Sequence, residues 1–213
     1  MKIAIVFSGR IKKYSQHLDN IFHNIVQGNE VDFFLSHSPD LIEDLDEFSR
    51  FYKPKIIIND PIKYKDYRKF ITHNETSLHN VSSMLINRLR VQKALLEYSN
   101  ENTITYDLVI SYRFDLFSYD KLDLNNILKE IQNNGDNYLF IPAGDDYGGI
   151  NDRVAIGSTY SISKYLQLYE KLDEIMESGN CIFHPEELLL YYIKTYCQDI
   201  VIKRLHSKFE IKR

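Results

Sequence analysis

The chain has 213 residues, a formal net charge of −4 and 44% hydrophobic residues. This length and apolar content suit one domain with a sizeable core. The sequence has no long basic run, so neither nucleic acid nor an anionic membrane surface is an expected partner. Two cysteines are too few for a disulfide framework, and no stretch approaches the roughly 20 apolar residues of a transmembrane segment. The opening apolar run is too short for a signal peptide, so we expect a cytoplasmic protein.

The amino-terminal part alternates between strand and helix patterns. Strands are predicted over residues 2–7, 31–36 and 55–59, with helices over 14–26 and 39–51 between them. This β-α-β-α-β order predicts parallel strands with helices on both faces, which is a nucleotide-binding type of half-domain.

A long segment without periodicity follows, from Ile62 to His79, and it predicts a loop with at most one turn of helix. Loops of that length inside a domain are uncommon and are frequently functional. Tyr64, Tyr67 and Phe70 offer rings that can stack on a base or a sugar. We expect this loop to order over a bound nucleotide or acceptor.

The remaining elements continue the same pattern to the end of the chain. Helices are predicted over residues 80–98, 122–132 and 158–176 and from Pro185 onward, and strands over 138–141 and 153–157, with a last apolar segment at 200–205. No internal repeat, low-complexity tract or linker divides the sequence. We therefore predict a single α/β domain over residues 1–213, which is complete in itself or the amino-terminal part of a longer protein.

The stretch 106–117 reads Y-D-L-V-I-S-Y-R-F-D-L-F, and its apolar β-formers predict a buried central strand. Arg113 and Asp115 follow on the same side of the strand end, because side chains alternate. Ligands of open α/β sheets bind outside the carboxyl ends of strands, where a carboxylate can hold a divalent cation that grips a diphosphate. The alternative is an Arg–Asp pair that closes the strand.

Other candidate contacts to a nucleotide lie at loops and on one helix. Ser8-Gly9-Arg10 follows the first strand and offers backbone donors and a cation, or else forms an ordinary turn. Asp60 precedes Pro61 and either forms a turn or contacts a base or ribose. Arg88 and Arg90 face different directions on their helix, so one can reach phosphates unless both lie on a solvated face.

Carboxylates surround the glycine-rich stretch 143–150. Asp145, Asp146 and Asp152 flank its double glycine, where they can bind sugar hydroxyls or act as a general base. Glu186 and Glu187 follow Pro185 in the first turn of a helix, a position that acids also occupy for the helix dipole alone.

Several enzyme classes lack their signatures in this sequence. There is no G-x-G-x-x-G, Walker loop or G-x-S-x-G, which disfavours dinucleotide, P-loop and serine-hydrolase chemistry. The seven histidines show no H-E-x-x-H spacing, which removes the usual zinc-hydrolase interpretation.

Four stretches carry a resemblance to a known family: F-S-G-R at 7–10, Y-D-L-V-I-S-Y-R-F-D at 106–115, G-G-I-N-D-R-V-A-I-G-S at 148–158 and H-P-E-E-L-L-L-Y-Y-I at 184–193. Over nearly its whole length the chain resembles the GT-A nucleotide-sugar glycosyltransferases. More narrowly, it resembles the amino-terminal glycosyltransferase domain of large chlorella-virus proteins that build capsid glycans. The resemblance implies a Rossmann-like, mostly parallel sheet and, for a viral protein, a location in the host cytoplasm.

The same resemblance implies roles for individual residues. The family's Asp-x-Asp metal motif is replaced by Arg113-Phe114-Asp115, which keeps only the last acid, so Asp115 is the implied ligand of Mn²⁺ or Mg²⁺ and His206 the second. Asp152, Glu186 and Glu187 are the implied catalytic acids. The implied contacts to the nucleotide sugar are Phe7, Ser8, Gly9, Arg10, Asp60, Arg88, Arg113 and Gly149.

The implied reaction transfers a hexose or deoxyhexose from a UDP-sugar to a hydroxyl of a glycan, with inversion preferred over retention. The metal would neutralise the leaving diphosphate and a carboxylate would deprotonate the acceptor. Two alternatives stay open: an α/β module that binds nucleotide sugar or glycan without turnover, and a nucleotidyltransferase on a similar sheet.

Overall fold

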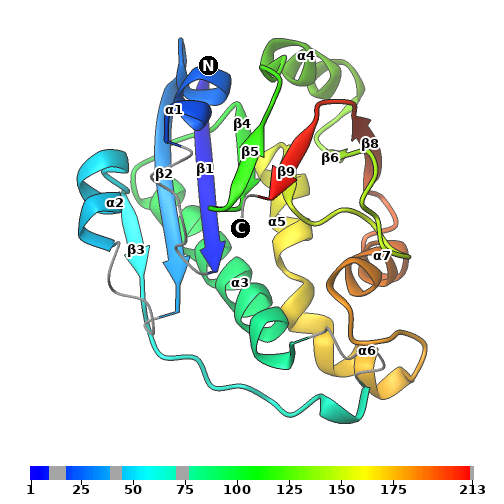
Figure 1. Cartoon of the computed structure of the whole chain (residues 1–213). Helices are drawn as coiled ribbons and strands as arrows, with labels where there is room; N and C mark the ends of the chain where they lie inside the picture. The colour runs from blue at the N-terminus through cyan, green and yellow to red at the C-terminus, as the bar shows by residue number, and fades with distance from the viewer. Residues whose placement is uncertain (10–17, 39–44, 71–76, 212–213) are drawn as a thin grey trace.

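A computed structural model describes residues 1–9, 18–38, 45–70 and 77–211. Its centre is a seven-stranded sheet in the order β3-β2-β1-β4-β7-β6-β8 (Figure 1). The strands are β1 (Lys2–Gly9), β2 (Glu30–His37), β3 (Ile56–Ile58), β4 (Leu108–Tyr112), β6 (Tyr138–Pro142), β7 (Val154–Gly157) and β8 (Val201–Leu205). Among these strands β7 runs antiparallel to both neighbours, whereas the others share one direction. The predicted mostly parallel α/β sheet is confirmed.

The alternation of side chains along β1 explains why the sheet has a core on each face. Ile3, Ile5 and Phe7 join one apolar cluster, while Ala4 and Val6 join the other. All five side chains are fully buried. A strand that is apolar at every position needs cover on both faces, and helices supply it.

The helices divide between these two faces. The cluster on the Phe7 face includes residues of α1 (Leu18–Ile21), the π-helical turn η2 (Phe22–Val26), α2 (Leu45–Tyr52) and α4 (Leu124–Asn134). The opposite cluster includes residues of α3 (Leu78–Glu101), α5 (Thr159–Leu166), the 3₁₀ turn η4 (Leu168–Lys171), α6 (Leu172–Ser178) and α7 (Pro185–Tyr196). The side chains of Ser77, Asp123 and Ser158 cap the first turns of α3, α4 and α5.

The one helix predicted over residues 158–176 is three consecutive pieces, α5, η4 and α6. Leu166, Leu168 and Leu172 are each at most 1% exposed. Residues two apart on a straight α-helix face different directions, so Leu166 and Leu168 could not both enter the core without the tighter 3₁₀ turn.

The segment predicted as a loop from Ile62 crosses the molecule from β3 to α6, as the cyan trace in Figure 1 shows. Lys65 and Tyr67 both bond to the carboxylate of Asp173 in α6. The Tyr67 ring is 5% exposed and stacks on Phe183 at 5.3 Å. A 3₁₀ turn, η3 (Arg68–Phe70), follows. Tyr67 is therefore a core residue, and the part of this segment that precedes residue 71 is anchored.

The carboxyl ends of β1, β2, β4 and β6 lie at one edge of the sheet, together with the amino end of β7. A small antiparallel pair, β5 (Leu116–Ser118) and β9 (Phe209–Ile211), lies beyond β4. The sequence pattern did not predict this pair. No helix among the described residues is long and apolar enough to cross a membrane.

Candidate active site

A buried ion pair joins α3 to the residues just before β7. Arg88 Nη2 donates to the backbone oxygen of Asp152 at 2.5 Å and lies 3.2 Å from its Oδ2. Both side chains are 3% exposed. Arg88 also lies over the ring of Tyr165, whose hydroxyl donates to the same Asp152 backbone oxygen at 2.9 Å. Because buried charges need partners, this arrangement fixes Asp152 at the edge of the sheet.

Arg113 and Asp115 form a second ion pair where β4 ends. Arg113 Nε and Nη2 each donate to one oxygen of Asp115 at 2.9 Å, a bidentate geometry that holds both side chains. Burial acts against the charged form of Arg113, but the bond to Asp115 and the charges of Asp115, Asp152 and Glu186 raise its pKa. The Arg–Asp pair that closes the strand is thus present. Arg113 also interacts electrostatically with Asp152 and Glu186.

Glu186 is the acid whose protonation is most strongly perturbed in this region. Its residue is 8% exposed, and its Oε2 lies 3.1 Å from Nδ1 of His184. Burial and the nearby negative charge of Asp152 raise the pKa of Glu186 to about 7. A carboxyl group with this pKa is partly ionised at neutral pH and can accept or deliver a proton, as a general acid or base must.

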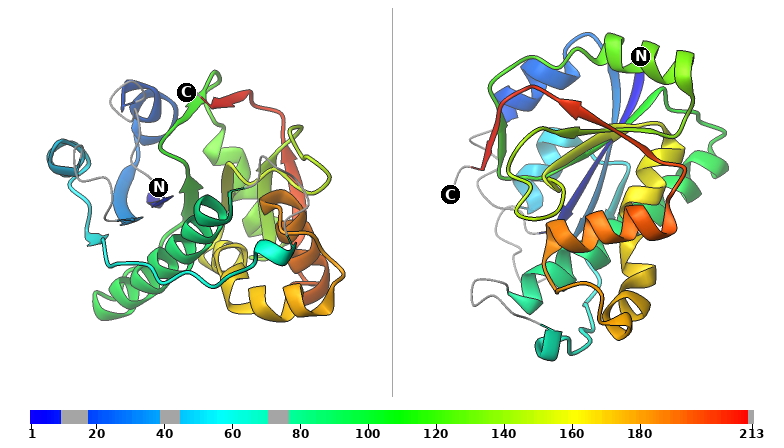
Figure 2. Two further views of the ribbon diagram at one scale, coloured as in Figure 1. Left: turned by 60° about the horizontal axis from the view of Figure 1, so that its bottom comes forward. Right: turned by 90° about the vertical axis from the view of Figure 1, so that its right-hand side faces the viewer.

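The glycine-rich loop packs directly on the start of α7, as the right view of Figure 2 shows. Ile150 N donates to Glu186 O at 3.2 Å. A Cβ on Gly149 would lie 2.0 Å from that backbone oxygen, so the contact requires glycine. Gly149 therefore serves packing of the loop, and Gly148 places the same loop beside the carboxylate of Glu187.

The described residues do not form a ready metal site. Both oxygens of Asp115 accept from Arg113, so a cation would have to displace the guanidinium. No group of three or more His, Cys, Asp or Glu side chains suited to a metal occurs within the described ranges, and His206 joins none. Binding of Mn²⁺ or Mg²⁺ through Asp115 and His206 therefore stays a prediction. In the arrangement that the structure shows, these two side chains do not form a metal site.

The other predicted nucleotide contacts differ in their access to a ligand. Phe7 is fully buried and stacks on Phe114 at 4.9 Å, so its side chain belongs to the core and does not face a nucleotide. Ser8 and Gly9 end β1 at the carboxyl edge. Gly9 has a φ of +104°, a conformation that favours glycine, and it is buried, whereas Ser8 is half-buried.

Asp60 is exposed just after β3, with its backbone oxygen held by Arg90 at 2.7 Å. Arg88 is committed to Asp152 and would have to break a buried pair to reach a phosphate. The predicted contact Arg10 lies outside the described residues.

Sequence reasoning missed the partners that orient these acids. Tyr165 gave no signal because an aromatic residue in a helix is ordinarily a core residue. Arg204 of β8 donates to both oxygens of Asp146 at 2.9 and 3.1 Å, and Arg153 pairs with Asp145. Two of the aspartates predicted to bind sugar hydroxyls are thus already bound to arginines.

Comparisons with solved structures place this arrangement among known folds. A provisionally assigned nucleotide-diphospho-sugar transferase from Desulfovibrio desulfuricans G20 matches with a TM-score of 0.53 and 9% identity, over 96% of this chain and 79% of that one. The chain has a GT-A nucleotide-sugar transferase fold.

Two further structures agree with this fold. Mouse xyloside xylosyltransferase 1 matches with a TM-score of 0.52 and 8% identity, over 96% of this chain and 85% of that one. The glycosyltransferase GlyE of Streptococcus pneumoniae matches with a TM-score of 0.50 and 14% identity. The match covers 96% of this chain but only 45% of GlyE. No protein-family model and no curated protein matches by sequence, so the narrower viral resemblance stays a prediction.

Proposed function

We propose that this chain is a glycosyltransferase that moves a hexose or deoxyhexose from a UDP-sugar to a hydroxyl of a glycan, with inversion at the anomeric carbon. The observation that carries the proposal is a buried cluster at the carboxyl edge of a GT-A sheet, in which Glu186 is 8% exposed and Asp152 lies near enough to help raise its pKa to about 7. Ligands of such sheets bind at that edge.

Glu186 is the general base in this proposal. The oxygen of the acceptor hydroxyl attacks the anomeric carbon, the bond from that carbon to the diphosphate oxygen breaks, and the hydroxyl proton passes to Glu186. The nucleoside diphosphate leaves with the bonding electron pair. Asp152 raises the basicity of Glu186, and Arg88 and Tyr165 keep Asp152 in place. Asp152 is therefore a positioning residue.

Arg113 is the resident cation of the cluster. Its side chain is 32% exposed at the end of β4, and its Nη1, which donates to neither oxygen of Asp115, can donate to a phosphate. We assign to it the stabilisation of charge on the leaving diphosphate. Half-buried Ser8, at the end of the neighbouring strand β1, is the proposed contact to the nucleotide. No step is assigned to a divalent cation, because Asp115 is engaged by Arg113.

A binding module without turnover is the second candidate. It is favoured by one observation, namely that Asp115 and Asp152 are both paired with arginines. The two candidates differ in the role of Glu186, which a binding module does not need as a base.

The test measures UDP binding by calorimetry and UDP release from a panel of UDP-sugars, separately. Glu186→Gln should bind UDP within a few-fold of wild type but release it about 100-fold more slowly. Glu97→Gln removes an exposed glutamate of α3 and serves as the matched control. Binding without release in the wild type would establish the binding module, and unchanged release in Glu186→Gln would remove Glu186 from the reaction.

A further inference from the structure

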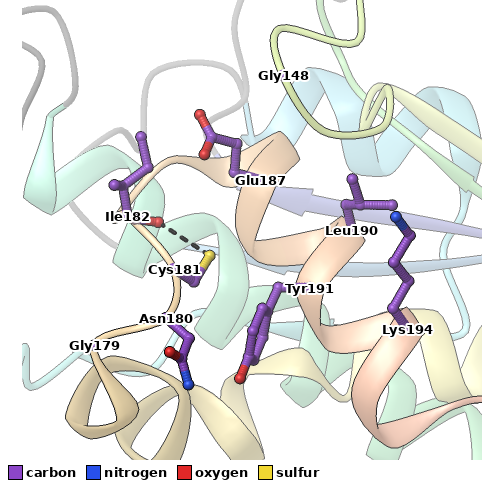
Figure 3. Close-up of a pocket in the computed structure, with 9 residues that line it drawn as sticks. All are labelled: Gly148, Gly179, Asn180, Cys181, Ile182, Glu187, Leu190, Tyr191 and Lys194. Carbon is purple, nitrogen blue, oxygen red and sulfur yellow. Dashed lines mark hydrogen bonds between the residues drawn. The ribbon is translucent and has the colours of Figure 1, made fainter.

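A hollow of about 350 Å³ lies between α7 and the segment that connects it to α6, outside the charged cluster (Figure 3). One wall is a single stripe of α7, because Glu187, Leu190, Tyr191 and Lys194 fall at positions i, i+3, i+4 and i+7. Asn180 and Cys181 of the connecting segment form the opposite wall. The volume lies within the range of small-molecule sites.

The polar groups of this hollow are available to a ligand. Within the described part of the chain, no hydrogen bond or ion pair occupies the side chains of Asn180, Glu187 or Lys194. Seven residues of helix put Glu187 and Lys194 about 10 Å apart along the axis, so they do not satisfy each other. Tyr191 is half-buried between them and presents an aromatic side chain.

This combination suits a neutral saccharide. Sugar hydroxyls pair with carboxylate, amide and ammonium groups, and the apolar face of a sugar ring packs on an aromatic ring. The hollow does not suit a nucleoside diphosphate, because Lys194 is the only cation among its nine lining residues and Glu187 opposes it. The stripe from Glu187 to Lys194 runs about 10 Å along α7, which is longer than one sugar ring.

The hollow also adjoins the proposed base. Glu186 and Glu187 are consecutive in the first turn of α7 and point apart, with Glu186 buried near Asp152 and Glu187 lining the hollow. The Gly148–Gly149 loop contacts both residues, and Gly148 itself lines the hollow. A saccharide held in the hollow could therefore extend one hydroxyl toward Glu186.

We infer that this hollow is the acceptor subsite, binding a neutral di- or trisaccharide through Glu187, Asn180 and the ring of Tyr191. The inference rests on the proposed function for its place in the reaction, but saccharide binding itself does not require transfer.

Cys181 gives a readout of occupancy that is independent of activity. It lines the hollow, whereas the other cysteine, Cys197, is 1% exposed in the core and serves as internal reference. Burial and the charge of Glu187 raise the pKa of the Cys181 thiol to about 11, so alkylation by iodoacetamide is slow and easily timed.

The experiment times alkylation of Cys181 by mass spectrometry with a pool of neutral di- and trisaccharides, with UDP, and with neither. At about ten times the dissociation constant the pool should slow the reaction about tenfold. Tyr191→Ala should abolish this protection, Tyr191→Phe should keep it, and Tyr160→Ala, which removes an exposed tyrosine elsewhere, should not change it. Thermal melts confirm that each variant is folded.

Protection by the pool in wild type and its loss in Tyr191→Ala establish the subsite. No protection by the pool, or equal protection in Tyr191→Ala, overturns it, and protection by UDP alone assigns the hollow to the donor. UDP-sugar hydrolysis in the same samples separates the two proposals. Hydrolysis without saccharide protection defeats only the acceptor subsite, and protection without hydrolysis defeats only the transferase.

Discussion

Glu186→Gln should make the protein more stable at the same time as it removes turnover. The pKa of Glu186 is raised from its ordinary 4.5 to about 7 by burial and by Asp152. The folded state therefore holds the proton more tightly than the unfolded state does. The stabilisation is complete below pH 4.5 and is lost as the pH rises through 7. Glutamine cannot ionise, so the variant does not suffer this loss.

The magnitude follows from the size of the shift. One pKa unit corresponds to about 1.4 kcal/mol, so a rise from 4.5 to about 7 corresponds to about 3 kcal/mol. Relative to wild type, the free energy of unfolding of Glu186→Gln should increase by about that amount between pH 4.5 and pH 8. The amide keeps the shape of the side chain, so packing should change little.

Urea unfolding followed by circular dichroism at several pH values measures this difference. Glu97→Gln controls for the loss of one negative charge. In parallel, UDP release by the wild type should rise with pH around a midpoint near 7, because the base must be ionised. If the stability difference between Glu186→Gln and wild type does not vary with pH, the raised pKa is refuted, and with it the argument for the base.

Three other predictions concern the neighbouring charges. Arg88→Met should lower the free energy of unfolding by about 3 kcal/mol, because Asp152 would stay buried without its partner. Arg90→Met removes a half-buried arginine that, among the described residues, bonds only to the backbone oxygens of Asp60 and Pro61, so it should cost clearly less, and equal losses in urea melts would contradict the pairing. UDP release should persist after treatment with EDTA, because the proposed mechanism assigns the charge of the leaving diphosphate to Arg113 and not to a metal. Activity that returns only with Mn²⁺ would restore Asp115 as a metal ligand. In calorimetry, Asp115→Asn should weaken UDP binding equally with and without Mn²⁺, because Arg113 loses the partner that holds it in position. A loss of affinity seen only when Mn²⁺ is present would indicate that Asp115 is a metal ligand.

The fold was predictable because its signals are local. Uninterrupted apolar runs such as Ile3 to Phe7 and Leu108 to Ile110 require cover on both faces, which fixes a central, largely parallel sheet. The antiparallel direction of β7 could not be predicted, because the short apolar sequence Val154–Gly157 suits a parallel and an antiparallel strand equally well. The division of the helix from Thr159 into three parts depends on which leucines pack in the core, and tertiary contacts decide that.

The site was predictable in part for a related reason. Asp152 and Glu186 were found from their places beside glycines and at a helix start, and the structure brings them close enough for the charge of Asp152 to act on Glu186. The partners of Asp152 are 64 residues away for Arg88 and 13 for Tyr165, and neither forms a motif with it. The error at Phe7 is of another kind. Its position next to a predicted loop did not indicate the direction of its side chain, which packs in the core.

Hydrogen exchange with and without UDP tests the central claim most directly, because the two edges of the sheet can be compared within one protein. UDP should slow exchange at the carboxyl edge, around Ser8–Gly9, residues 113–115 and the loop 143–153. The hollow at the amino edge, lined by Gly28, Asn29 and Lys121, is the internal control and should not change. Protection confined to that control region, or absent from both edges, would contradict a nucleotide-sugar site at the charged cluster.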